Sequence, residues 1–376
     1  MKIRDIKRFW QRLRTLRLPP SALLSMLYLV AIAVGSLLLM LPMSHNGNVG
    51  ISDAIFTSAS AVTVTGLTVL DTGSEFTLFG QMVIAVLIQL GGLGLMTFAV
   101  LLLLALGIPI GMPQRVLLRE NLNQSTTTSN LFVLSRLIIA IAIACEIVGT
   151  IALSFVFMPE FGFWAGLWQS LFHSISAFNN AGIQLFPNGL ANWVGDPIVN
   201  ITIPALFIVG GLGFIVVGDI YQKRAWKPLS LHSKLMLVGT GILIVFGSVG
   251  FGLLEWSNPD TLGALGHVQD KLWASWFQGV SPRTAGFNTV NIGGLHDSTS
   301  ILMMGLMLVG GGSTSTAGGI KVTTLAVLTL ATIAFFLRRK TLNAFGRSIG
   351  IDEVLKVMAL VTISIMIIFT AIFLIS

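Results

Sequence analysis

The chain has 376 residues, of which 54% are hydrophobic and only 10% are charged. A soluble domain carries about 25% charged residues, so the composition excludes an ordinary soluble protein and indicates an integral membrane protein. The net charge of +7 does not indicate a nucleic-acid-binding protein, because seven of the 22 basic residues lie within the first 17 positions. They form a basic arm that suits anionic lipid headgroups.

Seven apolar runs follow in chain order, each long enough for a helix that crosses a bilayer. They are 21–42, 78–107, 131–157, 198–220, 233–254, 298–337 and 352–376. Lys and Arg gather between the second and third, fourth and fifth, and sixth and seventh runs, whereas the other connections are acidic. Since basic loops stay in the cytosol, we expect a cytoplasmic N-terminus and odd-numbered spans that run outward.

The outer connections contain an internal repeat. Each unit has an outward span, a short half-apolar segment, a polar stretch with a glycine, and an inward span. The short segments, Asp53–Val62, Trp168–Phe178 and Trp273–Val280, cannot cross a bilayer. We therefore expect helices that dip in from outside and return. The glycines that follow them are Gly66, Gly182 and Gly286.

These glycine stretches predict an ion filter. Irregular backbone at membrane depth is tolerated only where it lines water or is buried in protein. Backbone carbonyls can replace the hydration shell of a cation, and glycine lets them turn because it adopts positive φ. Asn179 and Asn180 are expected to hold the second loop or to line its mouth. A loop that merely fills space is the alternative, and three copies at matched topology disfavour it.

A second glycine-rich stretch interrupts the sixth run and predicts a gate. Each glycine costs up to about 1 kcal/mol relative to Ala in a helix, and nearby hydroxyls can bond the freed backbone. We expect a mobile loop just below the filter, at the position where the first two units have "GGLG" (Gly91–Gly94 and Gly210–Gly213). Its residues are Gly310, Gly311, Gly312, Ser313, Thr314, Ser315, Thr316, Gly318 and Gly319, with Lys321 at the inner end.

Four charged residues have alternative interpretations. Lys321 could repel a cation, tie the loop to a carbonyl or acid, or simply extend to the interface. Glu146, in the middle of a span, could bind sodium or a proton, although a hydrogen bond to a neighbouring helix is the more common role. Arg283 is expected to brace the third filter loop. Asp219 could pair with Lys223, one helical turn further on, although a plain position on the cytosolic surface is the default.

The motifs resemble the Trk/Ktr/HKT superfamily of potassium transporters, and most closely the membrane subunits of Ktr systems. "TVTGL", "NNAGI" and "TAGFN" look like three filter segments of that family, and "GGGSTSTAGGIK" looks like its gate loop. The resemblance covers the chain from the basic arm to its last residue. It assigns the filter to Thr63, Val64, Thr65, Gly66, Asn179, Asn180, Ala181, Gly182, Thr284, Ala285, Gly286 and Phe287.

The resemblance implies an all-α membrane protein with helix–pore-loop–helix units around a pseudo-fourfold pore. The expected division is an arm (1–20), three repeats (21–112, 113–230 and 231–340, with the gate loop at 310–321) and the first helix of a fourth (341–376). The repeat spacing puts a fourth glycine beyond Ser376, so we expect an incomplete fourth repeat and no conduction by this exact chain.

The same resemblance implies potassium uptake across a bacterial plasma membrane, with K+ at the carbonyls of Gly66, Gly182 and Gly286 and with Na+ as a possible coupling or activating ion. It also implies a homodimer on a cytosolic KtrA-type ring, which alone would bind nucleotides.

Three other classes are less consistent with the residues. GGLG without a preceding strand does not indicate dinucleotide binding. A serine protease would need a histidine at the depth of Ser313, and we expect none there and no enzyme. A different secondary transporter with broken helices would usually have inverted repeats, whereas these are parallel.

Overall fold

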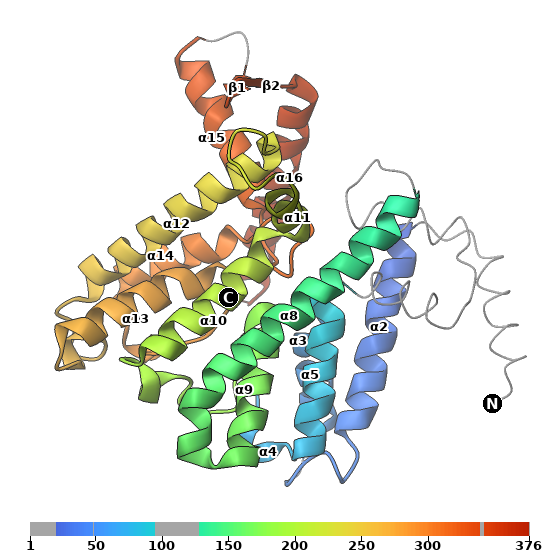
Figure 1. Cartoon of the computed structure of the whole chain (residues 1–376), viewed down its shortest axis with the longest axis vertical. Coiled ribbons are helices and arrows are strands. Elements are labelled where there is room, and N and C mark those ends of the chain that lie inside the picture. Colours follow the sequence, from blue (N-terminus) through green and yellow to red (C-terminus); the bar gives the residue numbers. More distant parts are fainter. Residues whose placement is uncertain (1–19, 48, 95–127, 339–341, 376) are drawn as a thin grey trace, which may run out of the picture.

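The computed structural model describes residues 20–47, 49–94, 128–338 and 342–375. Nearly all regular structure in these residues is helical, as predicted, and the helices form three groups that stand side by side (Figure 1). Most of the predicted basic arm, the end of the second apolar run and the basic loop after it lie outside the described residues.

The first group contains α2 (Pro20–Leu39), α3 (Ile51–Val62), the short α4 (Thr72–Glu75) and α5 (Leu78–Gly92). Both α2 and α5 pack against α3. Asp53 lies in the first turn of α3 and bonds the amide of Gly50, so it caps the start of this short helix. The group therefore holds a short helix between two longer ones, as the repeat pattern predicts.

The second group contains α8 (Thr128–Phe161), α9 (Phe163–Phe178), η1 (Ala191–Trp193), α10 (Pro197–Leu212) and α11 (Phe214–Lys223). Helix α9 packs along α8 and against α10. The prediction of one continuous span at 198–220 is wrong, because α10 and α11 meet at an angle of 93°.

The third group repeats the arrangement, with α13 packed on α12 and with a break between α14 and α15 at the predicted gate loop. Its elements are α12 (Leu231–Glu255), η2 (Leu262–Ala264), α13 (Val268–Val280), η3 (Ser281–Arg283), η4 (Ile292–Gly294), α14 (Asp297–Leu308) and α15 (Val322–Phe336). The three predicted re-entrant segments thus coincide with α3, α9 and α13.

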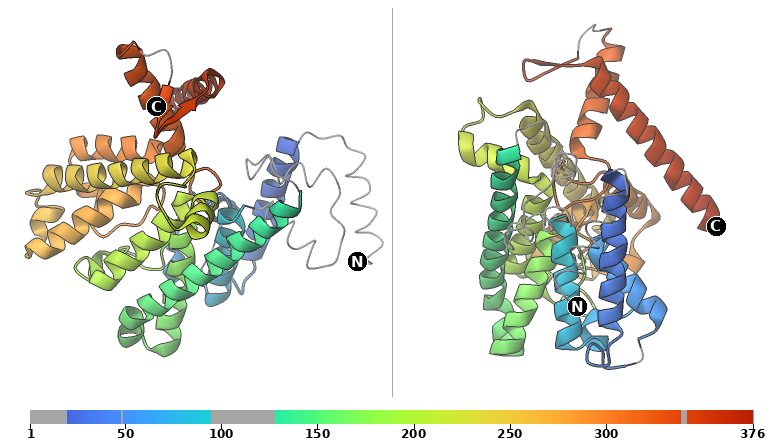
Figure 2. Two further views of the ribbon diagram at one scale, coloured as in Figure 1. Left: turned by 45° about the horizontal axis from the view of Figure 1, so that its top comes forward. Right: turned by 90° about the vertical axis from the view of Figure 1, so that its right-hand side faces the viewer.

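A small antiparallel hairpin of β1 (Leu342–Ala344) and β2 (Arg347–Ile349) follows, and the sequence analysis did not foresee it. Phe345 and Gly346 both have positive φ, the backbone of a tight two-residue hairpin turn. Helix α16 (Ile351–Ile375) then projects away from the three groups beside α15 (Figure 2).

Three helical stretches among the described residues have the length and apolar composition to cross a membrane alone: Arg136–Phe161, Leu231–Glu255 and Ile351–Leu374. The bent pair of α10 and α11 adds a fourth. The other predicted spans contain the shorter apolar helices α2, α5, α14 and α15. Helices α14 and α15 are short because the gate loop divides the sixth run, and α5 ends at Gly92, within the first GGLG stretch.

The two largest buried cores each join neighbouring groups. One combines Val62 and Ile84 of the first group with Phe172 and Ile183 of the second. The other combines side chains of the second and third groups, such as Phe178 with Phe277, Val280 and Phe287. Because the loops after α9 and α13 run through these cores, apolar burial fixes them in place.

Candidate ion filter and gate

The three glycines that follow α3, α9 and α13 converge at the junction of the groups. Gly66, Gly182 and Gly286 have φ of 81°, 70° and 76°, the left-handed region in which only glycine is unstrained. A Cβ on Gly66 would lie 2.3 Å from the carbonyl oxygen of Ala181, and one on Gly182 would lie 2.3 Å from that of Ala285. Gly66 and Gly182 therefore need glycine for both conformation and space, and Gly286 needs it for conformation.

Serines near the ends of two pore helices hold the backbone just beyond these glycines. The Ser176 hydroxyl donates to the carbonyl of Ile183 at 2.7 Å, and the Ser281 hydroxyl donates to the carbonyl of Phe287. The amide of Ala181 in turn donates to the Ser176 carbonyl at 2.8 Å. The carbonyls of Ile183 and Phe287 are thus engaged by the protein, although Phe287 was among the predicted filter residues.

Asn179 braces the second loop against two other helices and is fully buried. Its amide nitrogen lies 2.8 Å from Oε1 of Gln89 on α5 and 3.2 Å from Oε1 of Glu146 on α8. It also lies 2.9 Å from the carbonyl of Ile175, within its own helix. Glu146 therefore has the more common of its two predicted roles, a hydrogen bond to a neighbouring helix.

Asn180 braces the same loop on its other side, at a φ of 57°. Its amide nitrogen donates to Thr316 Oγ1 at 2.7 Å and to the carbonyl of Phe207 at 3.1 Å. Its amide oxygen accepts from Thr284 Oγ1 at 2.7 Å. The two adjacent asparagines thus hold the loop from behind, the first of the two arrangements that the sequence suggested.

Two cavities border the filter segments. The larger, of about 840 Å³, touches all three filter glycines together with the loops 67–72, 184–192 and 288–293. The smaller, of about 220 Å³, is lined by Thr63 and Val64 of the first filter segment and by gate residues 314–318. The first filter segment therefore borders both cavities, and the gate loop borders the smaller one.

The gate loop has a defined backbone structure of its own. The amide of Gly310 donates to the carbonyl of Ile320 at 2.9 Å, and the amide of Ile320 donates to the carbonyl of Leu308 at 3.1 Å. A Cβ on Gly310 would lie 1.7 Å from the carbonyl oxygen of Gly318. The two ends of the loop are therefore hydrogen-bonded to each other, and their close approach leaves no room for a side chain at Gly310.

The gate loop is also bonded to the broken inner helix of the second group. Gly312 donates its amide to the carbonyl of Gly211 at 2.7 Å, and Thr316 donates its amide to that of Gly210 at 3.2 Å. In return, the amide of Phe214 donates to the carbonyl of Thr314 at 3.0 Å. The unpaired backbone groups at a helix break are thus satisfied by the loop.

Gly213 makes this junction possible. It has a φ of 95°, and a Cβ there would lie 2.5 Å from the carbonyl oxygen of Ser313. The sequence contained the signal, since GGLG stood out inside an apolar run, but we did not interpret it as a helix break. The bend between α10 and α11 is the physical consequence of bonding the loop at this point.

The two basic residues beside the gate both bond carbonyls. Lys321 donates from Nζ to the carbonyl of Ala317 at 2.8 Å, which ties the inner end of the loop to itself. Arg283 is 7% exposed, and its Nη2 lies 3.4 Å from the carbonyl oxygen of Gly310. Arg283 therefore reaches from the third filter segment to the gate loop, in line with the predicted bracing.

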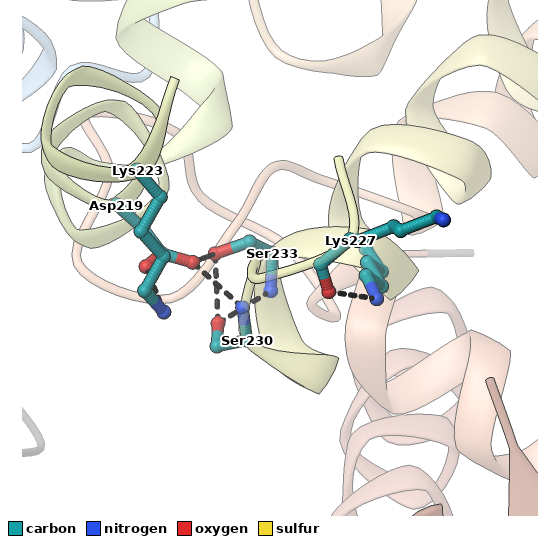
Figure 3. Close-up of polar contacts among 6 residues, drawn as sticks. Asp219, Lys223, Lys227, Ser230 and Ser233 are labelled. Carbon is teal, nitrogen blue, oxygen red and sulfur yellow. Dashed lines mark hydrogen bonds and ion pairs between the residues drawn. The ribbon is translucent and has the colours of Figure 1, made fainter. Parts of the chain in front are cut away.

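A polar cluster joins α11 to the start of α12 (Figure 3). Asp219 forms the predicted ion pair with Lys223, at 2.6 Å. Its other carboxylate oxygen accepts from the amide of Ser230 at 2.8 Å and from the hydroxyl of Ser233 at 2.7 Å. Nearby, Lys234 Nζ donates to the carbonyl of Lys227 at 3.0 Å. The helix after the bend is thereby anchored to the third group.

The predicted filter segments differ in burial and in their hydrogen bonds. The second and third filter segments are largely buried and bonded to the gate loop, whereas Thr63 and Thr65 are exposed and bond each other at 2.7 Å. Sequence reasoning missed Gln89, and it named the stretch Gly210–Gly213 without foreseeing its bonds to the gate loop. A glutamine inside the apolar run 78–107 was the available signal for Gln89.

Comparisons with known proteins identify relatives of this chain. A family model described as a cation transport protein, TrkH, matches residues 21–376. The Ktr system potassium uptake protein B of Bacillus subtilis is 46% identical and covers 96% of this chain and 81% of its own length. The potassium/sodium uptake protein NtpJ of Enterococcus hirae is 38% identical over 93% of this chain and 78% of its own.

A solved structure supports the fold independently. The crystal structure of the potassium transporter TrkH from Vibrio parahaemolyticus superimposes with a TM-score of 0.70, over 91% of this chain and 69% of that one. The sequence identity is 20%, so this likeness shows the fold. The relatives named here are ion transport proteins rather than enzymes, in agreement with the prediction from the sequence.

Proposed function

We propose that this chain, which belongs to the TrkH family of cation transport proteins, is the pore-forming membrane subunit of a Ktr-type potassium uptake system. The observation that carries the proposal is the convergence of Gly66, Gly182 and Gly286, all at positive φ, beside the larger cavity. The names of the relatives indicate potassium as the transported ion, and the junction of the three glycines is the proposed place where it binds.

In this proposal a potassium ion leaves its hydration water in the larger cavity and enters the junction of the three glycines. Their backbone carbonyls replace the lost water oxygens. The close approaches of Gly66 to Ala181 and of Gly182 to Ala285 keep the segments at a fixed spacing. Side chains are excluded from these positions, so the ion meets backbone oxygen rather than carbon.

The gate loop is proposed to open and close the path on the other side of the filter. Its residues 314–318 line the smaller cavity together with Thr63 and Val64, so the loop lies next to the exit of the filter. Its backbone bonds to Gly210 and Gly211 would hold the closed position. A movement of α11, which begins at the bend, would then release it.

The orientation and the partners are part of the same proposal. Lys223, Arg224 and Lys227 are exposed on the connection between α11 and α12, and basic connections favour the cytoplasmic side. We place this connection and the N-terminus in the bacterial cytoplasm, with the spans in the inner membrane. The proposal includes a homodimer on a nucleotide-binding cytosolic ring, with Na+ as a coupling or activating ion. The names of the Ktr system relatives support only that the chain works within a system, and the name of the potassium/sodium uptake protein NtpJ supports a role for Na+.

Uptake of Rb+ and Na+ by the full-length protein, in bacteria that lack their own potassium transporters, tests the filter. Gly182→Ala should abolish uptake, because its Cβ would meet the carbonyl oxygen of Ala285 at 2.3 Å. Gly241→Ala is the matched control, since a Cβ on this exposed glycine of α12 meets nothing within 4 Å. Normal Rb+ uptake by the Gly182 variant would contradict the proposed filter.

The same assay tests the gate with a second glycine pair. Gly213→Ala should detach the loop, because its Cβ would meet the carbonyl oxygen of Ser313 at 2.5 Å and its φ is 95°. Gly211→Ala should be tolerated, since its Cβ has no neighbour closer than 3.8 Å. We expect the Gly213 variant to lose control of uptake by the cytosolic partner. Equal behaviour of the two variants would argue against the gate.

A further inference from the structure

We infer that Asn180 and Thr316 are positioning residues that set the preference for K+ over Na+, because they link the gate loop to two filter segments. The inference rests on the proposed function and goes beyond it. It assigns selectivity to a hydrogen-bonded chain that runs from the gate loop through Thr316 and Asn180 to Thr284. None of these three side chains needs to touch the ion.

The link has a donor and an acceptor at every step. Thr316 Oγ1 donates to the carbonyl of Phe178, the last residue of α9, at 3.0 Å. The same oxygen accepts from Nδ2 of Asn180 at 2.7 Å. Oδ1 of Asn180 then accepts from Thr284 Oγ1 at 2.7 Å. One hydroxyl of the gate loop therefore bonds both the end of a pore helix and a filter side chain.

Burial makes this link sensitive to loop movement. Asn180 is 2% exposed and Thr316 is 7% exposed. If the loop moved away, the amide of Asn180 would lose an acceptor and the carbonyl of Phe178 would lose a donor, both in a buried site. The amide of Asn180 would keep its bond to the carbonyl of Phe207 at 3.1 Å and a long contact with the carbonyl of Phe178 at 3.4 Å. The loss of the remaining bonds in a buried site is unfavourable, so the filter would rearrange to replace them.

The rearrangement would act on the spacing between the second and third filter segments. Asn180 adopts a φ of 57°, which is uncommon for a residue with a side chain and is maintained here by its surroundings. Gly182 lies two residues after Asn180, and Gly286 lies two residues after Thr284. The two glycines are in close contact, since a Cβ on Gly182 would lie 3.1 Å from the Cα of Gly286. The number and positions of the coordinating carbonyls decide which ion is preferred, so the link ties selectivity to the state of the gate.

Other hydroxyls of the loop provide a contrast. Thr314 donates to the carbonyl of Ser313 at 2.6 Å, and Ser315 donates to that of Gly312 at 2.7 Å. Both bonds stay inside the loop, whereas those of Thr316 leave it. Thr314 and Thr316 are thus a matched pair, in which the same substitution removes a loop-internal hydroxyl or one that reaches the filter.

The experiment compares Thr316→Val with Thr314→Val in the full-length protein. Competition between Rb+ and Na+ is measured in cells and normalised to the amount of protein inserted in the membrane. Thr316→Val should lower the preference for Rb+ by about five- to tenfold, the effect of one or two buried hydrogen bonds. Thr314→Val should change the preference much less than Thr316→Val does, because its hydroxyl bonds only within the loop. Thr316→Ser should keep the normal preference because it retains the hydroxyl.

A double variant tests whether the two residues act as one unit. If they do, Asn180→Ala combined with Thr316→Val should change the preference no more than the larger single change. Thr316→Ala serves as a second variant if valine prevents insertion. A changed rate with an unchanged Rb+/Na+ preference, or additive effects in the double variant, would overturn the inference. Absence of Rb+ uptake by the unaltered protein would instead refute the proposed function itself.

Discussion

The first and second filter segments have the same local layout but very different surroundings. In each, a serine lies six positions before the filter glycine: Ser60 before Gly66 and Ser176 before Gly182. Ser176 is bonded to the backbone beyond its glycine, whereas the buried hydroxyl of Ser60 has no partner among the described residues. An identical local pattern has therefore produced one tightly held segment and one loosely held segment.

The difference arises from side chains that other helices contribute. The second segment receives Gln89 from the first group and Thr316 from the third, and it lies within two apolar cores. In the first segment, Thr63 and Thr65 bond each other and remain exposed. Tertiary contacts, rather than the sequence of the segment itself, decide how firmly a filter segment is held.

The largest difference between the two segments should appear when Asn179→Ala is compared with Thr63→Val. The two positions are equivalent, because each lies three residues before its filter glycine. Asn179→Ala removes a buried amide and leaves Glu146 with one donor fewer, at a cost of about 3 kcal/mol. Thr63→Val removes an exposed hydroxyl, which should change stability by less than about 0.5 kcal/mol. Thermal unfolding of the purified protein and Rb+ uptake measure both, and equal losses would refute the contrast.

A smaller effect is expected when the carboxyl group of the brace is replaced but its shape is kept. Glu146→Gln still offers an oxygen to Asn179, so it should change the free energy of unfolding by no more than about 1 kcal/mol, the size of one ordinary hydrogen bond. Glu160→Gln on the same helix is the control, because Glu160 is exposed and its carboxylate accepts a hydrogen bond from the indole nitrogen of Trp193. A larger loss for Glu160→Gln, by thermal unfolding, would contradict this assignment.

The smallest effect separates the two serines. Ser176→Ala should cost about 1 kcal/mol, because the buried carbonyl of Ile183 loses its donor. Ser60→Ala should be neutral or slightly stabilising, since it removes a buried hydroxyl that has no partner in the part of the chain that the structure describes. Unfolding midpoints measured side by side would distinguish the variants. Identical midpoints would mean that the serine bond does not hold the second segment.

The sequence predicted the parts of the fold that depend on spacing and composition. Short half-apolar segments followed by Gly66, Gly182 and Gly286 predicted α3, α9 and α13 and the turns after them, because length and glycine content are local properties. The break at Gly213 was not predicted, since a glycine is compatible with either a helix or a bend. Its conformation is decided by the gate loop, about 100 residues further along the chain.

The brace around the second loop was predictable only in part. Two adjacent asparagines between apolar runs indicated a polar role, but most of their partners come from other segments of the chain. Gln89, Glu146 and Thr316 are far from Asn179 and Asn180 in sequence and meet them only through the packing of the groups. The hairpin at β1 and β2 was missed because a three-residue strand carries too little periodicity to recognise.

The most direct test of the central claim is a crystal structure of the full-length protein grown with Rb+, whose anomalous scattering locates the ion. The account predicts a peak on the line shared by the three segments, in contact with the backbone carbonyls of Gly66, Gly182 and Gly286. A peak that touches none of these carbonyls, with the junction of the glycines closed to ions, would contradict it.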